Sequence, residues 1–157
     1  MAKDPDPADF DDPVRLRGII RNADRLGRPE LVTACQVRIA ELAGQEFDEP
    51  IERDFWEAVT MAEEVRTLAN GKTTRLSRTR LKHRRDGAVK CIEDIAAKPE
   101  LTAGFDFLVE SGHPDLTFEA IALRHPQSFT EETLTAARAK LTDAGVDVDN
   151  AVKRERL

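Results

Sequence analysis

Apolar residues recur every three or four positions along most of the chain, and this helical spacing constrains the fold more than any other feature. No stretch combines apolar–polar alternation with the β-branched side chains that strands favour. Aromatic residues make up only 5% of the chain, and tyrosine is absent. This scarcity argues against a β-sandwich, which uses aromatic and β-branched residues on its sheet faces. We predict an all-α fold, a compact domain of about seven helices.

Prolines, glycines and capping residues delimit the first two predicted helices. Asp12 can cap a helix that begins at Pro13, because a proline at this position needs no N–H. Gly27 can end this helix, and Pro29 can open a second one that ends at Gly44. Because the turn between them is so short, the two segments should form an antiparallel helical hairpin.

The same signals predict the helices that follow. The segment 50–70 keeps the 3.6-residue period over about five turns. Further helices are expected over 88–98 and 105–111. Two more should begin after Thr117 and Thr130, because each threonine precedes a helical pattern and can act as its N-cap.

The ends of the chain differ in composition from its middle. Residues 1–12 contain five aspartates and two prolines and have little to bury, so we expect a disordered acidic lead-in, with an acidic interaction tail as the alternative. Residues 146–157 are charged and poor in apolar side chains, and should form a frayed tail. Residues 13–145 should form a single helical domain, although a sub-lobe boundary near residue 71 stays open.

The charge of the chain is distributed very unevenly. Seven Lys or Arg residues and no acidic residue lie between positions 72 and 85. From 72 to 90 there are eight basic residues and one acidic residue, whereas the rest of the chain has sixteen basic and twenty-nine acidic residues. A strongly positive segment on an acidic body is the pattern that a function must explain.

We interpret the basic segment as a helix that contacts nucleic acid, DNA more than RNA, by neutralising backbone phosphates. If the helix begins near Thr74, it places four cations in one phosphate-facing row and Arg80 and Arg84 on another side. The row consists of Arg75, Arg78, Lys82 and Arg85. Hydroxyl groups between the cations can bind phosphate oxygens. The predicted binding residues are Lys72, Arg75, Ser77, Arg78, Thr79, Arg80, Lys82, Arg84 and Arg85.

Two other interpretations of the basic segment stay open. In one, acidic residues of other helices neutralise it internally. In the other, it binds an acidic protein surface or a second copy of the chain, which would make the protein an adaptor or a homodimer. If four or more of the seven cations lay within about 4 Å of an acid from another helix, little charge would be left for a polyanion.

The position of the basic segment between two predicted helices is similar to a helix-turn-helix. Only Leu76 and Leu81 are available to face a core, and the segment has no Asn or Gln to read adenine. We therefore expect recognition of the backbone or of shape rather than of base sequence. In composition the chain resembles small helical DNA-associated modules of a bacterial type, which implies an accessory or regulatory role but identifies no family.

No motif for catalysis, a cofactor or a metal is found. The sequence from Gly71 to Thr74 is similar to the end of a phosphate-binding loop, but Arg66 stands where that loop requires a glycine. The histidines and the two cysteines are scattered without metal-ligand spacing. We therefore expect a protein that is not an enzyme and holds no cofactor.

The two cysteines also indicate the cellular compartment in which the protein is found. With no apparent signal peptide, they indicate reduced thiols and a cytoplasmic protein. No apolar run approaches the ~20 residues that a transmembrane helix needs, so we expect no contact with a membrane.

Overall fold

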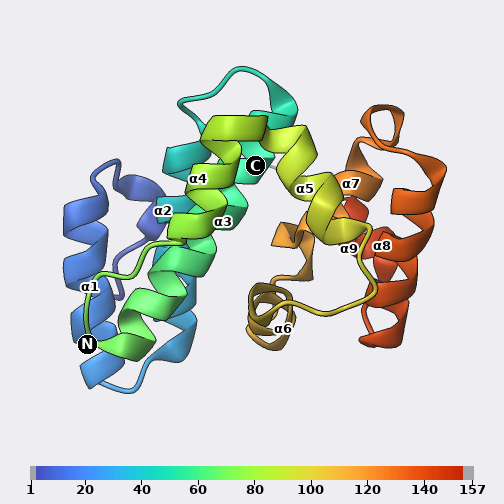
Figure 1. Cartoon of the computed structure of the whole chain (residues 1–157). Helices are drawn as coiled ribbons and strands as arrows, with labels where there is room; N and C mark the ends of the chain where they lie inside the picture. The colour runs from blue at the N-terminus through green and yellow to red at the C-terminus, as the bar shows by residue number, and fades with distance from the viewer. Residues whose placement is uncertain (1–2, 154–157) are drawn as a thin grey trace.

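The structure is a computed structural model that describes residues 3–153, and all of its regular elements are helical (Figure 1). Within these residues there are nine α-helices and three short 3-10 helices, and no strand. The all-α prediction is therefore confirmed, with more helices than the seven or so expected. The α-helices are α1 (Pro13–Arg25), α2 (Pro29–Gly44), α3 (Pro50–Asn70), α4 (Ser77–Asp86), α5 (Ala88–Ala96), α6 (Ala103–Glu110), α7 (Phe118–Arg124), α8 (Glu131–Asp143) and α9 (Val148–Val152).

The opening hairpin forms as the sequence predicts. The Asp12 carboxylate accepts a hydrogen bond from the Val14 backbone N–H at 2.9 Å, which caps the helix that starts at Pro13. Helices α1 and α2 then pack against each other, and α2 packs against α3 (Figure 1). Side chains such as Leu16 and Cys35 are fully buried between α1 and α2.

Helix α3 is the longest element and contacts both halves of the molecule. One side faces α2, while the other faces α5 and α7. Its Phe55 and Val59 belong to the largest buried cluster, together with Ile92 of α5 and Ile121 of α7. This cluster therefore draws on residues from both sides of position 71, where the sequence left a sub-lobe boundary open.

Threonine side chains cap the starts of α7 and α8, as predicted. Thr117 Oγ1 accepts a hydrogen bond from the Ala120 N–H at 3.1 Å, and Thr130 Oγ1 accepts one from the Thr133 N–H at 3.2 Å. Each threonine follows a short 3-10 helix that starts at a proline, η2 (Pro114–Leu116) before Thr117 and η3 (Pro126–Ser128) before Thr130. The two His-Pro segments of the sequence therefore lead to helices built in the same way.

The N-terminal segment is more ordered than the expected lead-in. Residues 7–9 form a short 3-10 helix, η1 (Pro7–Asp9), and Phe10 packs against the cluster shared by α1 and α2. Arg38 of α2 donates a hydrogen bond to the Phe10 carbonyl at 3.0 Å and pairs with Asp11 at 2.7 Å. Phe10, Arg38 and an ion pair between Arg28 and Asp4 thus hold this acidic segment on the hairpin, while residues 1–2 lie outside the described part.

The C-terminal segment also differs from the frayed tail expected over 146–157. Residues 148–152 form α9, with Val148 and Ala151 buried against Leu141 of α8 and Phe105 of α6. Arg124 donates hydrogen bonds to the carbonyl oxygens of Ala151 and Val152, both at 3.1 Å. Residues 154–157 lie outside the described part. Among the described helices, none is both long enough and apolar enough to cross a membrane.

Candidate nucleic-acid interface

The basic segment folds as a loop followed by α4, and the helix starts later than predicted. Gly71 ends α3 in the left-handed conformation, at φ 71°. The backbone N–H of Thr74 then donates to Thr67 Oγ1 at 2.9 Å, and the N–H of Leu76 donates to a Glu63 carboxylate oxygen at 2.8 Å. Because these side chains of α3 hold the backbone of residues 74–76, the helix begins at Ser77 and not near Thr74.

The inward side of α4 is tied to α3 by ion pairs. Arg80 donates from Nε and Nη2 to the two carboxylate oxygens of Glu63, at 2.7 and 2.6 Å. Its guanidinium also lies 5.1 Å from the centre of the Trp56 ring. The His83 ring nitrogen lies 2.9 Å from a Glu52 carboxylate oxygen. Glu52, Trp56 and Glu63 occupy one face of α3, so α4 runs antiparallel along this face.

The Glu63 carboxylate stabilises the charged form of Arg80. Its hydrogen bond raises the pKa of Arg80, against the opposing effect of burial. The Glu63 side chain is only 8% exposed, and its oxygens accept from both Arg80 and the Leu76 N–H. Arg80 is therefore a structural cation, turned away from any ligand that approaches the outer surface.

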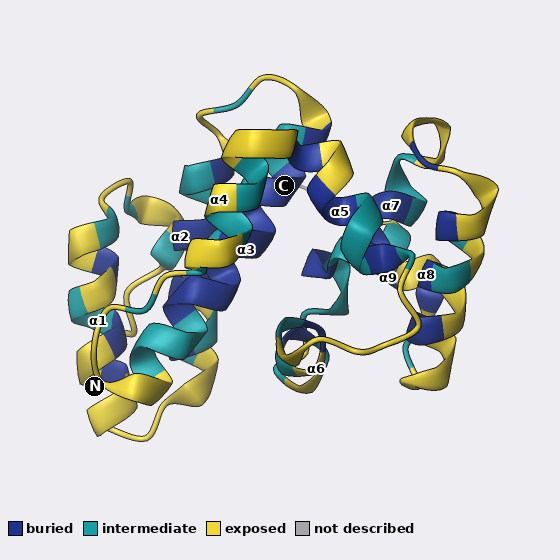
Figure 2. Ribbon diagram, in the orientation of Figure 1, coloured by how far each residue is buried: buried dark blue, intermediate teal, exposed yellow. Residues whose placement is uncertain are grey.

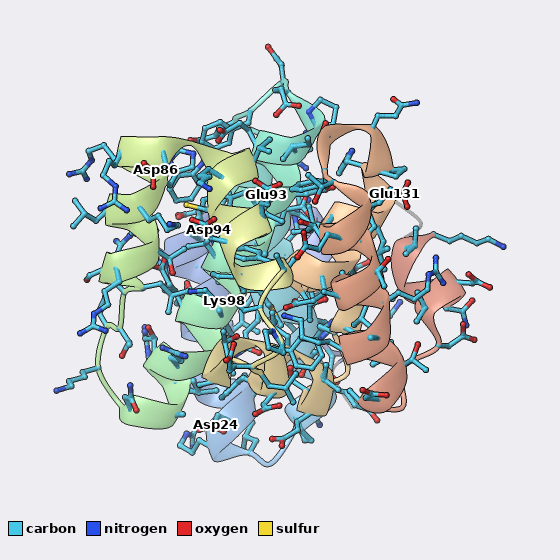
Figure 3. All side chains as sticks on the ribbon, turned by 45° about the vertical axis from the view of Figure 1, so that its right-hand side comes forward. Asp24, Asp86, Glu93, Asp94, Lys98 and Glu131 are labelled. Atoms are coloured by element: carbon cyan, nitrogen blue, oxygen red, sulfur yellow. The ribbon has the colours of Figure 1, made fainter. Side chains whose placement is uncertain are left out.

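A second set of ion pairs joins α4 to α5. Lys82 Nζ lies 2.5 Å from an Asp94 oxygen, and Lys90 Nζ lies 3.0 Å from the other oxygen of the same carboxylate. Hydrogen bonds from Lys82 and then Lys90 lower the pKa of Asp94. Asp86 of α4 and Asp94 of α5 are labelled on neighbouring helices in Figure 3. Arg85 pairs at 3.1 Å with the adjacent Asp86, yet its side chain stays 66% exposed.

The outer side of the segment carries cations without such partners. Within residues 3–153, Lys72, Arg75, Arg78 and Arg84 form no ion pair with a carboxylate, and all four are exposed. The exposed surface of α4 is visible in Figure 2 as yellow stretches of its ribbon. Together with Arg85, which is exposed although it pairs with the adjacent Asp86, these four cations form a set that we call the outer cations: Lys72, Arg75, Arg78, Arg84 and Arg85.

Only two of the seven cations, Arg80 and Lys82, reach an acid of another described helix. This is fewer than the four that would leave little charge for a polyanion. Internal neutralisation is therefore partial, and it is confined to the side of α4 that faces α3 and α5.

The outer cations differ from the predicted phosphate-facing row. Of that row, Arg78 and Arg85 lie on the exposed side of α4, Arg75 lies in the preceding loop, and Lys82 turns to Asp94. The two predicted binding residues with hydroxyl groups differ in exposure: Ser77 is exposed, whereas Thr79 is partly buried. One signal could have indicated this arrangement: the spacing of Glu52 and Glu63 on α3 offers two carboxylates on one helix face.

A groove of about 710 Å³ lies beside the outer cations, between α3 and the α1–α2 hairpin. Its lining includes Arg75, but also the carboxylates Glu46, Glu63 and Glu64. Glu64 pairs with Arg17 across this groove at 2.6 Å. Because Arg17 and Arg80 also line the groove and pair with Glu64 and Glu63, its lining has little net charge, and the exposed outer cations form the more positive surface.

Within the part of the chain that the structure describes, no three His, Cys, Asp or Glu side chains gather as a metal site would require. Cys35 and Cys91 are both buried, and burial raises the pKa of each thiol. No known protein family, curated protein or solved structure matches this chain. Its function must therefore be inferred from the side chains that the fold exposes.

Proposed function

We propose that this protein binds nucleic acid, DNA in preference to RNA, through contacts of the outer cations with backbone phosphates. It would act as a non-enzymatic accessory or regulatory protein. One observation supports this proposal above all: Lys72, Arg75, Arg78 and Arg84, which lie within one short segment of an acidic chain, are exposed and form no ion pair with a carboxylate in residues 3–153.

Phosphate neutralisation fits both the charge and the placement of these residues. Like charges repel one another along a short helix, so a surface with four unpaired cations is stabilised by an anionic ligand. Each phosphate contact releases condensed counterions, which supplies most of the free energy of non-specific binding. The exposed Ser77 hydroxyl lies among these cations and can donate to a phosphate oxygen.

Base-specific reading is not part of the proposal. The side of α4 that carries Arg80 and His83 is occupied by α3, so the helix cannot enter a groove on that side. The outer side offers arginine and lysine but no Asn or Gln, the usual adenine partners. We therefore expect affinity to depend on phosphate charge far more than on sequence.

A salt titration of binding to a labelled duplex DNA tests the proposal. If the outer cations contact four or five phosphates, log affinity should fall against log salt with a slope of about −4. The triple variant Arg75→Gln, Arg78→Gln, Arg84→Gln should lose most of this slope and bind at least about tenfold more weakly at low salt. Parallel titration of duplex RNA of equal length decides the preference for DNA.

The matched control is the triple variant Arg21→Gln, Arg25→Gln, Arg138→Gln, which removes three exposed arginines and the same net charge. It should keep the slope of the original protein. Absence of binding at low salt would refute the proposal. An equal loss of affinity in both triple variants would also refute it, because only total charge would then matter.

A second candidate function, a protein–protein adaptor or homodimer, is favoured by one apolar residue. Leu81 is 57% exposed on the outer side of α4, next to the outer cations, and Val89 at the start of α5 is 38% exposed. An exposed leucine flanked by arginines also suits a contact with an acidic protein surface. Light scattering at low salt distinguishes the two functions. A dimer that Leu81→Ser dissociates supports the adaptor, whereas a monomer whose DNA affinity survives Leu81→Ser supports nucleic-acid binding.

A further inference from the structure

A cavity of about 160 Å³ lies between α3 and the segments that contain α6 and α7. Ala58, Val59 and Ala62 of α3 form one wall, and Phe105 and Leu108 of α6 belong to the opposite side. Ala58 and Ala62 lie one turn apart on the same helix face. Because each contributes only a methyl group, α3 leaves space that larger side chains would fill.

The size and lining of this cavity suit one small ring. Engineered protein cavities of about 150 Å³ that are lined by aliphatic and aromatic side chains bind benzene. Here the five wall residues are apolar and all of them are buried. Among the lining residues, Arg66 and Thr79 are partly exposed and Thr102 is exposed, so polar side chains are present where the lining reaches solvent.

Arg66 gives the cavity a chemical preference. It lies one turn after Ala62 on the same face of α3, lines the cavity and is half-buried. Within residues 3–153 it forms no ion pair with a carboxylate. Glu119 also lines the cavity; its Oε1 lies 2.7 Å from the Lys140 ammonium, which compensates its charge, although this oxygen accepts no hydrogen bond within residues 3–153. The cavity therefore combines an apolar interior with one uncompensated positive charge.

We propose that this cavity binds a small aromatic or short-chain carboxylic acid. The ring or alkyl chain would occupy the space beside Ala58 and Ala62, and the carboxylate would accept hydrogen bonds from the Arg66 guanidinium. This site is separate from the outer cations, and the proposal does not depend on nucleic-acid binding. A monoanion with an apolar body satisfies both features of the cavity, whereas a neutral ring satisfies only one.

Benzoate is the probe, and calorimetric titration of the full chain is the measurement. A ligand of this size should bind with a Kd of about 1 mM. Toluene and benzylamine, which share the ring but not the negative charge, should bind at least about fivefold more weakly. Arg66→Gln should weaken benzoate about tenfold while leaving toluene unchanged. Arg21→Gln, which removes an exposed arginine of α1, should change neither.

A second variant tests the cavity itself. Ala62→Leu places a larger side chain in the space and should abolish benzoate binding; because the cavity of about 160 Å³ can hold the added atoms, the melting temperature should not fall. If this variant does not fold, the comparison of Arg66→Gln with Arg21→Gln decides the question alone. The proposal is overturned if the original protein shows no saturable benzoate binding, if toluene and benzylamine bind as tightly as benzoate, or if Arg66→Gln and Ala62→Leu leave benzoate affinity unchanged.

Discussion

Glu63 determines which side of the basic helix faces the solvent. Its carboxylate accepts two hydrogen bonds from Arg80 and one from the Leu76 N–H, and its side chain is nearly buried. Removing one partner of a buried pair is costly, because the other charge stays desolvated. The residue therefore fixes both the start of α4 and its rotation about its own axis.

We expect Glu63→Ala to lower the free energy of unfolding by about 3 kcal/mol, because Arg80 and the Leu76 N–H lose their acceptor. Urea unfolding followed by circular dichroism measures this change. Glu100→Ala removes an exposed carboxylate from the loop after α5 and should alter stability by less than about 0.5 kcal/mol. Equal effects of the two substitutions would show that the Glu63 pair contributes nothing beyond surface charge.

At the residue scale, local interactions could be predicted and distant ones could not. The caps made by Asp12, Thr117 and Thr130 bond to backbone groups two or three residues ahead, so the sequence contains both partners in order. The pairs Glu63–Arg80 and Glu52–His83 join residues 17 and 31 positions apart. Each of these acids has many basic residues as alternative partners, and only the packing of α4 on α3 selects one.

At the scale of single helices, α7 and α8 offer a matched pair of N-caps. Thr117 is 1% exposed, accepts from the Ala120 N–H and donates its hydroxyl hydrogen to the Pro114 carbonyl at 2.7 Å. Thr130 makes the corresponding bond to Thr133 but is exposed. A buried cap leaves its backbone partner without water when it is removed, so the two helices should respond differently.

Thr117→Ala should therefore cost about 2 kcal/mol of unfolding free energy and Thr130→Ala about 1 kcal/mol or less. Chemical denaturation of both variants under the same conditions measures the difference. Replacement by serine, which keeps the hydroxyl, should restore most of the loss at position 117. If the exposed cap proved the more costly of the two, burial would not be the factor that sets its strength.

Helices whose ends are marked by residues close in the sequence were predicted more accurately than helices whose ends depend on contacts with distant residues. Helices α1, α2 and α3 were predicted with close to their observed bounds, because proline, glycine and capping residues mark their ends. Helix α4 begins three residues later than expected, since Thr67 and Glu63 of α3 hold the preceding loop. Helix α9 was missed because its burial depends on distant partners, namely Phe105 and Leu141 and the hydrogen bonds from Arg124.

At the scale of the whole molecule, Arg124 connects elements that are far apart in the chain. Its guanidinium pairs with Asp54 of α3 at 3.2 Å and donates to the Asp115 carbonyl at 2.9 Å, in addition to its bonds to α9. Together with the largest buried cluster, this network joins the N-terminal and C-terminal halves. We expect the two halves to unfold together.

Arg124→Ala should lower stability by about 3 kcal/mol while keeping a single unfolding transition. Trp56, the sole tryptophan, packs against the cluster shared by both halves, so its fluorescence reports on their contact, whereas circular dichroism reports on all helices. The two signals should have coincident midpoints in the original protein and in the variant. Arg138→Ala, at an exposed position of α8, should leave the midpoint unchanged. Separate midpoints would indicate two independently folding lobes that meet near residue 71.

The attachment of α4 to α3 through Arg80 and His83 also affects the conformational entropy that would be lost when a polyanion binds. Many basic segments are disordered when free, and they lose conformational entropy when they fold on a polyanion. Here Arg78, Arg84 and Arg85 already project from a formed helix, and Arg75 lies in a loop whose backbone is held by Thr67 and Glu63, so only the side chains must adopt new conformations. Association should therefore proceed with little change in helicity and a small heat-capacity change, as expected for a preorganised template.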